Sequence, residues 1–250
     1  LAAVPFNRYP DRAATALRTA IGELHGVGPE QILAGNGSNE VIQALCLAYG
    51  GAGRTVAVFE PTYALHSHIP RITGTGVAVG ERRADFTLDP AEVTGVLTEA
   101  KPAITFLCSP NNPTGVIDST EVVEAALAAA PGLVVVDEAY GQFTPTSALP
   151  LVSADRPLVV TRTFSKTWSM AACRLGYLVA PAGIVTASGA GRAASGADKG
   201  RGARPGRHAP LSLRALSPSL VRPPGDVDDR VHHRDVHGAH VGSRVPRRGR

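Results

Sequence analysis

Three polar residues follow apolar runs of the sequence and carry side chains that could act together in one reaction. Asp137 closes the run Val135-Val136-Asp137, Lys166 closes Thr163-Phe164-Ser165-Lys166, and Arg174 stands eight residues after that lysine. A carboxylate at the end of a buried strand is costly unless a cation or a hydrogen-bond donor meets it. A lysine amine can form a Schiff base, and an arginine can bind a phosphate. Lys166 is therefore a candidate for a covalent bond to a ligand, Asp137 for holding a proton, and Arg174 for binding an anion.

Two loops add a second anion-binding feature and further polar groups. The segment Gly35-Asn36-Gly37-Ser38-Asn39-Glu40 leads into a helix, whose free N–H groups and dipole favour an anion. The segment SPNNPTG at 109–115 follows another apolar run. Pyridoxal phosphate needs an amine, an acid for its ring nitrogen and a phosphate cradle. The contacts expected with this cofactor are Lys166 (amine), Asp137 (ring nitrogen), the backbone of Ser38, Asn39 and Glu40 with Thr163, Ser165 and Arg174 (phosphate), Asn112 and Tyr140 (ring oxygen), and Tyr63 (ring face).

The elements that must position these residues alternate between helix and strand. Apolar residues at helical spacing predict helices near 14–24, 41–48 and 121–129, and Asp89-Pro90-Ala91-Glu92 is typical of a helix start. Strands are predicted by short apolar runs at 55–59, 77–79, 104–108, 133–136 and 158–161. Continuous apolar strands separated by helices predict an α/β three-layer sandwich with a mostly parallel sheet. Such a sheet binds ligands at the carboxyl ends of its strands, where Asp137 and Lys166 lie.

Composition excludes several classes of protein. With 44% hydrophobic residues in 250 and a mean hydropathy of +0.03, the chain can bury a core, which argues against wholesale disorder. No run of eighteen apolar residues occurs and no basic-then-apolar leader is visible, so we expect neither a membrane span nor a secretory signal. Three cysteines without C-x-x-C spacing favour the reducing cytoplasm. His66 and His68 stand two residues apart, on different sides of a helix, so we expect no metal site.

The last part of the chain differs in composition, and we expect a domain boundary after residue 186. Residues 187–250 carry a formal charge of +8, whereas residues 1–186 carry −4. The tail has twelve Arg, ten Gly and six Pro but no aromatic residue, which predicts that it cannot form a core. It is interpreted as a disordered basic extension or as the product of a shifted reading frame. Nucleic-acid binding by its arginines is disfavoured because no aromatic residue is present to stack on bases.

Six motifs in one order give the chain a resemblance to a known family. They are NRYPD at 7–11, GNGSNE at 35–40, EPTY at 60–63, SPNNPTG at 109–115, VVVDEAY at 134–140, and TFSK at 163–166 followed by RLGY at 174–177. Single motifs of this kind are weak, but six in order are specific. Over residues 5–181 the chain resembles fold-type I pyridoxal-phosphate aminotransferases of class I and II, and most closely the histidinol-phosphate aminotransferase family.

The resemblance implies a cofactor-binding large domain with assigned residue roles. Lys166 would hold the cofactor covalently, Asp137 would pair with its ring nitrogen, and Arg174 would bind its phosphate. Tyr9 would belong to an arm that reaches the cofactor phosphate of a neighbouring subunit, which implies a homodimer. The implied reaction transfers nitrogen from histidinol phosphate to 2-oxoglutarate in histidine biosynthesis. An aromatic amino-acid aminotransferase, a threonine-phosphate decarboxylase-like enzyme, and an inactive remnant with a nucleic-acid-binding tail remain as alternatives.

The family pattern is expected to be incomplete at both ends. Only six residues precede Asn7, where the family has an N-terminal substrate-binding segment. The pattern fades after about Ala187, where the family has a small C-terminal domain with the arginine that binds the substrate carboxylate. We therefore expect this chain to bind the cofactor but to turn over its small amino-acid and keto-acid substrates slowly.

Overall fold

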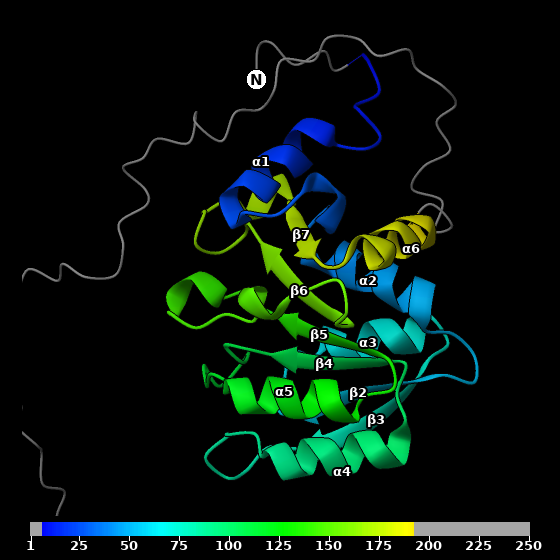
Figure 1. The fold of residues 1–250 in the computed structure, drawn as a ribbon, viewed down its shortest axis with the longest axis vertical. Helices are drawn as coiled ribbons and strands as arrows, with labels where there is room; N and C mark the ends of the chain where they lie inside the picture. Colours follow the sequence, from blue (N-terminus) through cyan, green and yellow to red (C-terminus); the bar gives the residue numbers. More distant parts are fainter. Residues whose placement is uncertain (1–6, 193–250) are drawn as a thin grey trace, which may run out of the picture. The chain divides into compact units, whose positions relative to one another are not determined.

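A seven-stranded sheet organises residues 7–192, which are the part of the chain that the computed structural model describes (Figure 1). The strand order is β1-β7-β6-β5-β4-β2-β3. Strands β2 to β6 pair in parallel, and β7 runs antiparallel to both β1 and β6. The prediction of a mostly parallel sheet is thus confirmed. The strands are β1 (Ile32–Gly35), β2 (Thr55–Glu60), β3 (Gly76–Glu81), β4 (Ile104–Cys108), β5 (Leu133–Asp137), β6 (Leu158–Thr163) and β7 (Gly176–Val179).

Helices cover the two faces of this sheet, as Figure 1 shows. One apolar cluster packs α2, α3 and α6 against Val135 and Val159, and another packs α4 and α5 against Val134 and Val136. Neighbouring residues of a strand point to opposite faces. The alternation continues beyond the cluster residues of β5, so Asp137 and Glu138 point to different faces. The helices are α1 (Thr15–His25), α2 (Ser38–Tyr49), α3 (Leu65–Ile72), α4 (Pro90–Ala100), α5 (Thr120–Ala129) and α6 (Ala182–Arg192).

Several predicted elements have the local chemistry expected of them. Asp89 caps α4 by accepting a hydrogen bond from the Ala91 N–H, and Pro90 occupies the first helical position. The run 104–108 forms β4 with every residue buried, as expected for a strand covered on both faces. No described helix has the length and apolar character needed to cross a membrane.

The boundary expected after residue 186 does not match the end of the last described helix. Helix α6 continues from Ala182 to Arg192, and it buries Val185 and Ser188. Residues 187–192 therefore belong with the sheet domain, because α6 packs against α2 and the apolar side of the sheet. The domain boundary itself stays a prediction, because α6 gives only the end of the last described helix. The remaining tail, residues 193–250, lies outside the described residues.

Candidate functional site

A cleft of about 190 Å³ lies where β4, β5 and β6 end and α2 begins. This is the position at which parallel α/β sheets bind ligands. Ten of the twelve residues predicted to contact the cofactor line this cleft, together with Cys108, Ala139 and Ala171. The ten are Ser38, Asn39, Tyr63, Asn112, Asp137, Tyr140, Thr163, Ser165, Lys166 and Arg174.

Asp137, the last residue of β5, is only 1% exposed and is held by three donors. Its Oδ1 accepts hydrogen bonds from the Ala139 N–H and the Thr161 hydroxyl, both at 3.1 Å. Its Oδ2 lies 2.9 Å from Nε2 of His66. A carboxylate only accepts hydrogen bonds, so Nε2 of His66 is the donor in this contact. These donors compensate for burial and fix the direction in which the carboxylate points.

His66 is a site residue that sequence analysis did not assign. It is fully buried on α3, its ring stacks on Phe106 at 4.8 Å between centroids, and Tyr63 meets it edge-on at 5.4 Å. Its Nδ1 is buried without a hydrogen-bond partner among the described residues. His68 is exposed on the other side of the helix, as the two-residue spacing predicted. His66 and Asp137 are 71 positions apart in the sequence. No local pattern links them, so only the fold reveals this pair.

Lys166 follows β6 and is exposed at the mouth of the cleft. Its Nζ lies 5.3 Å from the centroid of the Tyr140 ring. The turn that carries the lysine is held by Thr163, whose Oγ1 accepts from the Ser165 N–H at 3.1 Å and donates to the Ser165 hydroxyl at 3.0 Å. The lysine amine therefore projects from an ordered turn rather than from the buried strand itself.

The start of α2 and Arg174 form the anion-binding end of the cleft. The N–H groups of the first helical turn have no partner within the helix, and Gly37 offers no side chain to cap them. Gly37 adopts a positive φ of 88°, and a Cβ there would lie 2.8 Å from Nη2 of Arg174. The backbone of Arg174 adopts a positive φ of 49°, and its side-chain Nη1 donates to the Ala171 carbonyl. Glycine at 37 thus keeps space open between a helix N-terminus and a guanidinium.

The loop after β2 brings Tyr63 to the cleft, and Asn111 fixes this loop. The Tyr63 hydroxyl donates to Oδ1 of Asn39 at 3.2 Å, and partial burial raises the pKa of the phenol. Asn111 donates through Nδ2 to the Pro61 carbonyl at 3.0 Å, and its Oδ1 accepts from the Thr62 hydroxyl. The sequence predicted a cofactor contact only for the second asparagine of SPNNPTG, Asn112. The first one connects two loops that carry cleft residues.

Two predicted residues are not among those that line the cleft, and three unpredicted residues, Cys108 among them, are. Tyr9 is 76% exposed, and Glu40 directs its carboxylate to the backbone N–H of Asn36, outside the cleft. The sequence prediction for Glu40 concerned its backbone N–H, which remains at the first turn of α2. Cys108 lies at the floor of the cleft, and burial raises the pKa of its thiol to about 12. This thiol therefore stays protonated at neutral pH.

A family comparison matches most of the chain. The model for the family described as "Aminotransferase class I and II" matches residues 1–199. A curated relative, histidinol-phosphate aminotransferase of Thermobifida fusca, is 47% identical over 192 residues, which cover 74% of this chain and 52% of that protein. The chain spans about half the length of the curated relatives it matches.

Solved structures of similar fold agree with the family match. An aspartate aminotransferase from Thermotoga maritima superposes with a TM-score of 0.67 at 26% identity, covering 76% of this chain and 54% of the other. A histidinol-phosphate aminotransferase from Sinorhizobium meliloti, solved in complex with pyridoxal-5'-phosphate, gives a TM-score of 0.65 at 23% identity. It covers 76% of this chain and 57% of the other, and it indicates likeness of fold.

Proposed function

The chain belongs to the class I and II aminotransferase family, and on this premise we propose that it forms the cofactor-binding part of a pyridoxal-phosphate-dependent histidinol-phosphate aminotransferase. One observation carries the proposal. Lys166, Asp137 and Arg174 come from separate segments yet line the same cleft, so one cleft offers an amine, a fixed carboxylate and a guanidinium.

The residues present fit the chemical needs of this cofactor. A phosphate requires donors and positive charge, which the first turn of α2 and Arg174 supply around the space that Gly37 keeps open. A pyridine nitrogen requires an acceptor for its proton, and Asp137 offers a carboxylate fixed by His66 and Thr161. An aldehyde requires a reachable amine, and Lys166 is exposed at the cleft mouth.

Each cleft residue would have a defined role in the reaction. Bound pyridoxal phosphate supplies an electron-accepting ring that stabilises negative charge on the α-carbon of the substrate. Asp137 would keep a proton on the ring nitrogen, and Lys166 Nζ would take the proton from the α-carbon of the substrate. The remaining contacts orient the cofactor: Asn112 and Tyr140 at the ring oxygen, Tyr63 at the ring face, and Thr163, Ser165, Arg174 and the N–H groups of Ser38, Asn39 and Glu40 at the phosphate.

The substrate proposal rests on curated relatives. Eight of these relatives are histidinol-phosphate aminotransferases, at 40–47% identity to this chain. No observation favours the aromatic aminotransferase, the decarboxylase or the inactive remnant over this reading. We also propose a homodimer in which the exposed Tyr9 reaches the site of the second subunit. A cytoplasmic location would suit Cys46, Cys108 and Cys173, which are all free thiols.

The proposed substrate can be tested by following one half-reaction through the visible absorbance of the cofactor. The purified chain is loaded with pyridoxal phosphate and mixed with equimolar histidinol phosphate, phenylalanine or threonine phosphate, because one turnover needs no second substrate. Histidinol phosphate should discharge the visible band of the lysine-bound cofactor fastest. Lys166→Ala should lack that band from the start, whereas the control Lys101→Arg, at the C-terminal end of α4, should retain it. A faster reaction with phenylalanine or threonine phosphate would contradict the proposed substrate.

A further inference from the structure

Behind the cofactor cleft, on the opposite face of the sheet, lies a buried ion pair that the proposed reaction does not use. Asp137 of β5 pairs with Thr161 of β6, so the next residues of the two strands, Glu138 and Arg162, are neighbours on the other face. Nη2 of Arg162 lies 2.6 Å from Oε2 of Glu138, and Nε lies 3.0 Å from the same oxygen. The Glu138 side chain is 2% exposed and that of Arg162 is 10% exposed.

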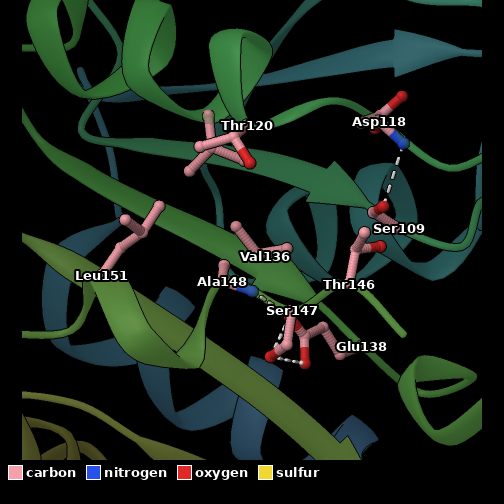
Figure 2. Close-up of a pocket in the computed structure, with 10 residues that line it drawn as sticks. Ser109, Asp118, Thr120, Val136, Glu138, Thr146, Ser147, Ala148 and Leu151 are labelled. Atoms are coloured by element: carbon pink, nitrogen blue, oxygen red, sulfur yellow. Dashed lines mark hydrogen bonds between the residues drawn. The ribbon is translucent and has the colours of Figure 1, made fainter. Parts of the chain in front are cut away.

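Two further groups complete the surroundings of Glu138, and both come from the C-terminal end of the loop 139–148, which follows β5. The Ala148 N–H donates to Oε1 at 2.6 Å, and the Ser147 hydroxyl donates to Oε2 at 2.9 Å. Ser147 also accepts from Nη2 of Arg162 at 3.1 Å. Figure 2 shows Ser147 and the Ala148 nitrogen directed at the Glu138 carboxylate. One carboxylate thus joins the ends of β5 and β6 to the far end of the loop.

The loop closed in this way carries Tyr140. The Gly141 N–H donates to the Glu138 carbonyl at 2.9 Å, and a Cβ at Gly141 would lie 2.9 Å from Cβ of Glu138, so only glycine fits this tight return. Beside the pair is a polar cavity of about 30 Å³, drawn in Figure 2, that Glu138 and Ser147 both line. The hydrogen bonds that Ser147 and Ala148 donate to Glu138 therefore help to hold the loop in place.

We propose that the Glu138–Arg162 pair positions the cofactor site from behind the sheet by holding Tyr140 beside Lys166. The pair connects both sides of that contact, because Glu138 precedes Tyr140 by two residues and Arg162 precedes Lys166 by four. Lys166 Nζ lies 5.3 Å from the Tyr140 ring centroid, and Gln142 of the same loop accepts from the Thr167 hydroxyl. The role of the Tyr140–Lys166 contact in cofactor binding rests on the proposed function, whereas the restraint that the ion pair places on the loop does not.

The test compares two arginines in similar surroundings. Arg162→Lys keeps the charge but removes the forked contact with Glu138. Arg82→Lys is the control, because Arg82 makes a forked pair with Asp118, at 2.7 and 2.9 Å, that is buried even more fully, and Arg82 does not line the cleft. Ser147→Ala is a milder variant that keeps the ion pair and removes the hydrogen bonds that the Ser147 hydroxyl makes with both of its members. Amide hydrogen exchange of residues 139–148 is measured without cofactor, and pyridoxal phosphate affinity is measured by absorbance titration.

Arg162→Lys should raise exchange in residues 139–148 by about 10-fold or more, the factor expected for losing one hydrogen bond to a charged group. It should also weaken cofactor affinity by about 10-fold, and Ser147→Ala should change both quantities in the same direction by less. Arg82→Lys should lower the unfolding temperature but leave both quantities unchanged.

Three results would overturn the proposal: unchanged loop exchange in both Arg162→Lys and Ser147→Ala, equal loop exchange in Arg162→Lys and Arg82→Lys, or raised exchange with unaltered cofactor affinity. A parent chain that binds no pyridoxal phosphate would instead contradict the proposed function. In that case the exchange measurement would still decide whether the pair restrains the loop.

Discussion

At the scale of single residues, the surroundings of Asp137 constrain the chemistry most directly. Its carboxylate is buried at the floor of an open cleft and receives hydrogen bonds from His66, Thr161 and the Ala139 backbone. Such fixed acceptors are effective because they need no reorganisation when charge develops in the reaction. The residue is therefore suited to hold a proton on a ligand nitrogen.

Replacing this carboxylate by an amide should slow the reaction much more than it weakens cofactor binding. Asp137→Asn preserves side-chain shape but removes the charge, so cofactor affinity should change by less than about 10-fold while the single-turnover rate falls by about 100-fold or more. Absorbance titration with pyridoxal phosphate measures the affinity, and rapid-mixing absorbance with histidinol phosphate measures the rate. Asp155→Asn, at an exposed turn, is the matched control. A rate for Asp137→Asn close to that of the control would refute the role of the carboxylate.

The residues that sequence analysis identified share a local signature. Asp137 is the last residue of β5 and Lys166 follows the end of β6 by three residues, and parallel strands end at one edge of the sheet. His66 and Asn111 lack such a signature, because their hydrogen-bond partners lie 71 and 50 positions away in the chain. Contacts of that kind become visible only once α3 and the loops have been placed.

At the scale of elements, Gly176 lets β7 approach the start of α2. A Cβ at this position would lie 2.2 Å from the backbone nitrogen of Ser38, which cannot move aside without moving the helix. Gly176→Ala should therefore lower the free energy of unfolding by about 1–3 kcal/mol and weaken phosphate binding at α2.

A second glycine provides the control for this substitution. Gly95 lies inside α4, and a Cβ added there would meet nothing within 4 Å, so Gly95→Ala should stabilise the protein by about 0.5–1 kcal/mol. Urea unfolding of both variants gives the comparison. Equal stabilities for the two variants would show that α2 and β7 are not in the close contact described.

The docking of α1 on β7 should make stability depend on pH. Burial, and then the charge of Arg162, lowers the pKa of His25 from 6.5 to about 4, and its Nε2 lies 2.7 Å from the Tyr177 hydroxyl. Below pH 6.5 the unfolded chain binds a proton that the folded chain does not, so stability falls as the pH drops from about 6.5 to 4. His25→Gln should lose less stability over this range. Parallel curves for parent and variant in denaturant titrations would contradict this.

The strands and helices could be predicted to different degrees. The long apolar runs gave β4 with the same bounds as the structure, and β2, β5 and β6 within two residues at their ends. The four-residue strands β1 and β7 were missed, because a run so short has no clear period and is stabilised mainly by its pairing. Their antiparallel pairing at one side of the sheet follows from tertiary contacts rather than from local sequence.

At the scale of the whole molecule, the described part of the chain supplies a cofactor cleft but few groups for the substrate. Among the described residues, Lys166 and Arg174 are the cationic side chains that line the cleft, and both are assigned to the cofactor. Clamping a substrate in a reactive orientation can contribute about 7–11 kcal/mol to catalysis. Residues 7–192, produced as a fragment, should therefore bind pyridoxal phosphate within about 10-fold of the Thermobifida fusca relative but turn over at least about 100-fold more slowly. Equal turnover in steady-state assays of glutamate formation would contradict the prediction.

The central claim is that Lys166 is the residue that bonds to the cofactor, and chemical trapping tests it most directly. The full chain is incubated with pyridoxal phosphate, reduced with borohydride, digested and analysed by mass spectrometry. Three lysines compete in this experiment: Lys101, Lys166 and Lys199. We expect stoichiometric label on Lys166, and Asp137→Asn should lose label only to the extent that its cofactor affinity falls. Label distributed over the three lysines, or concentrated on Lys101 or Lys199, would contradict it.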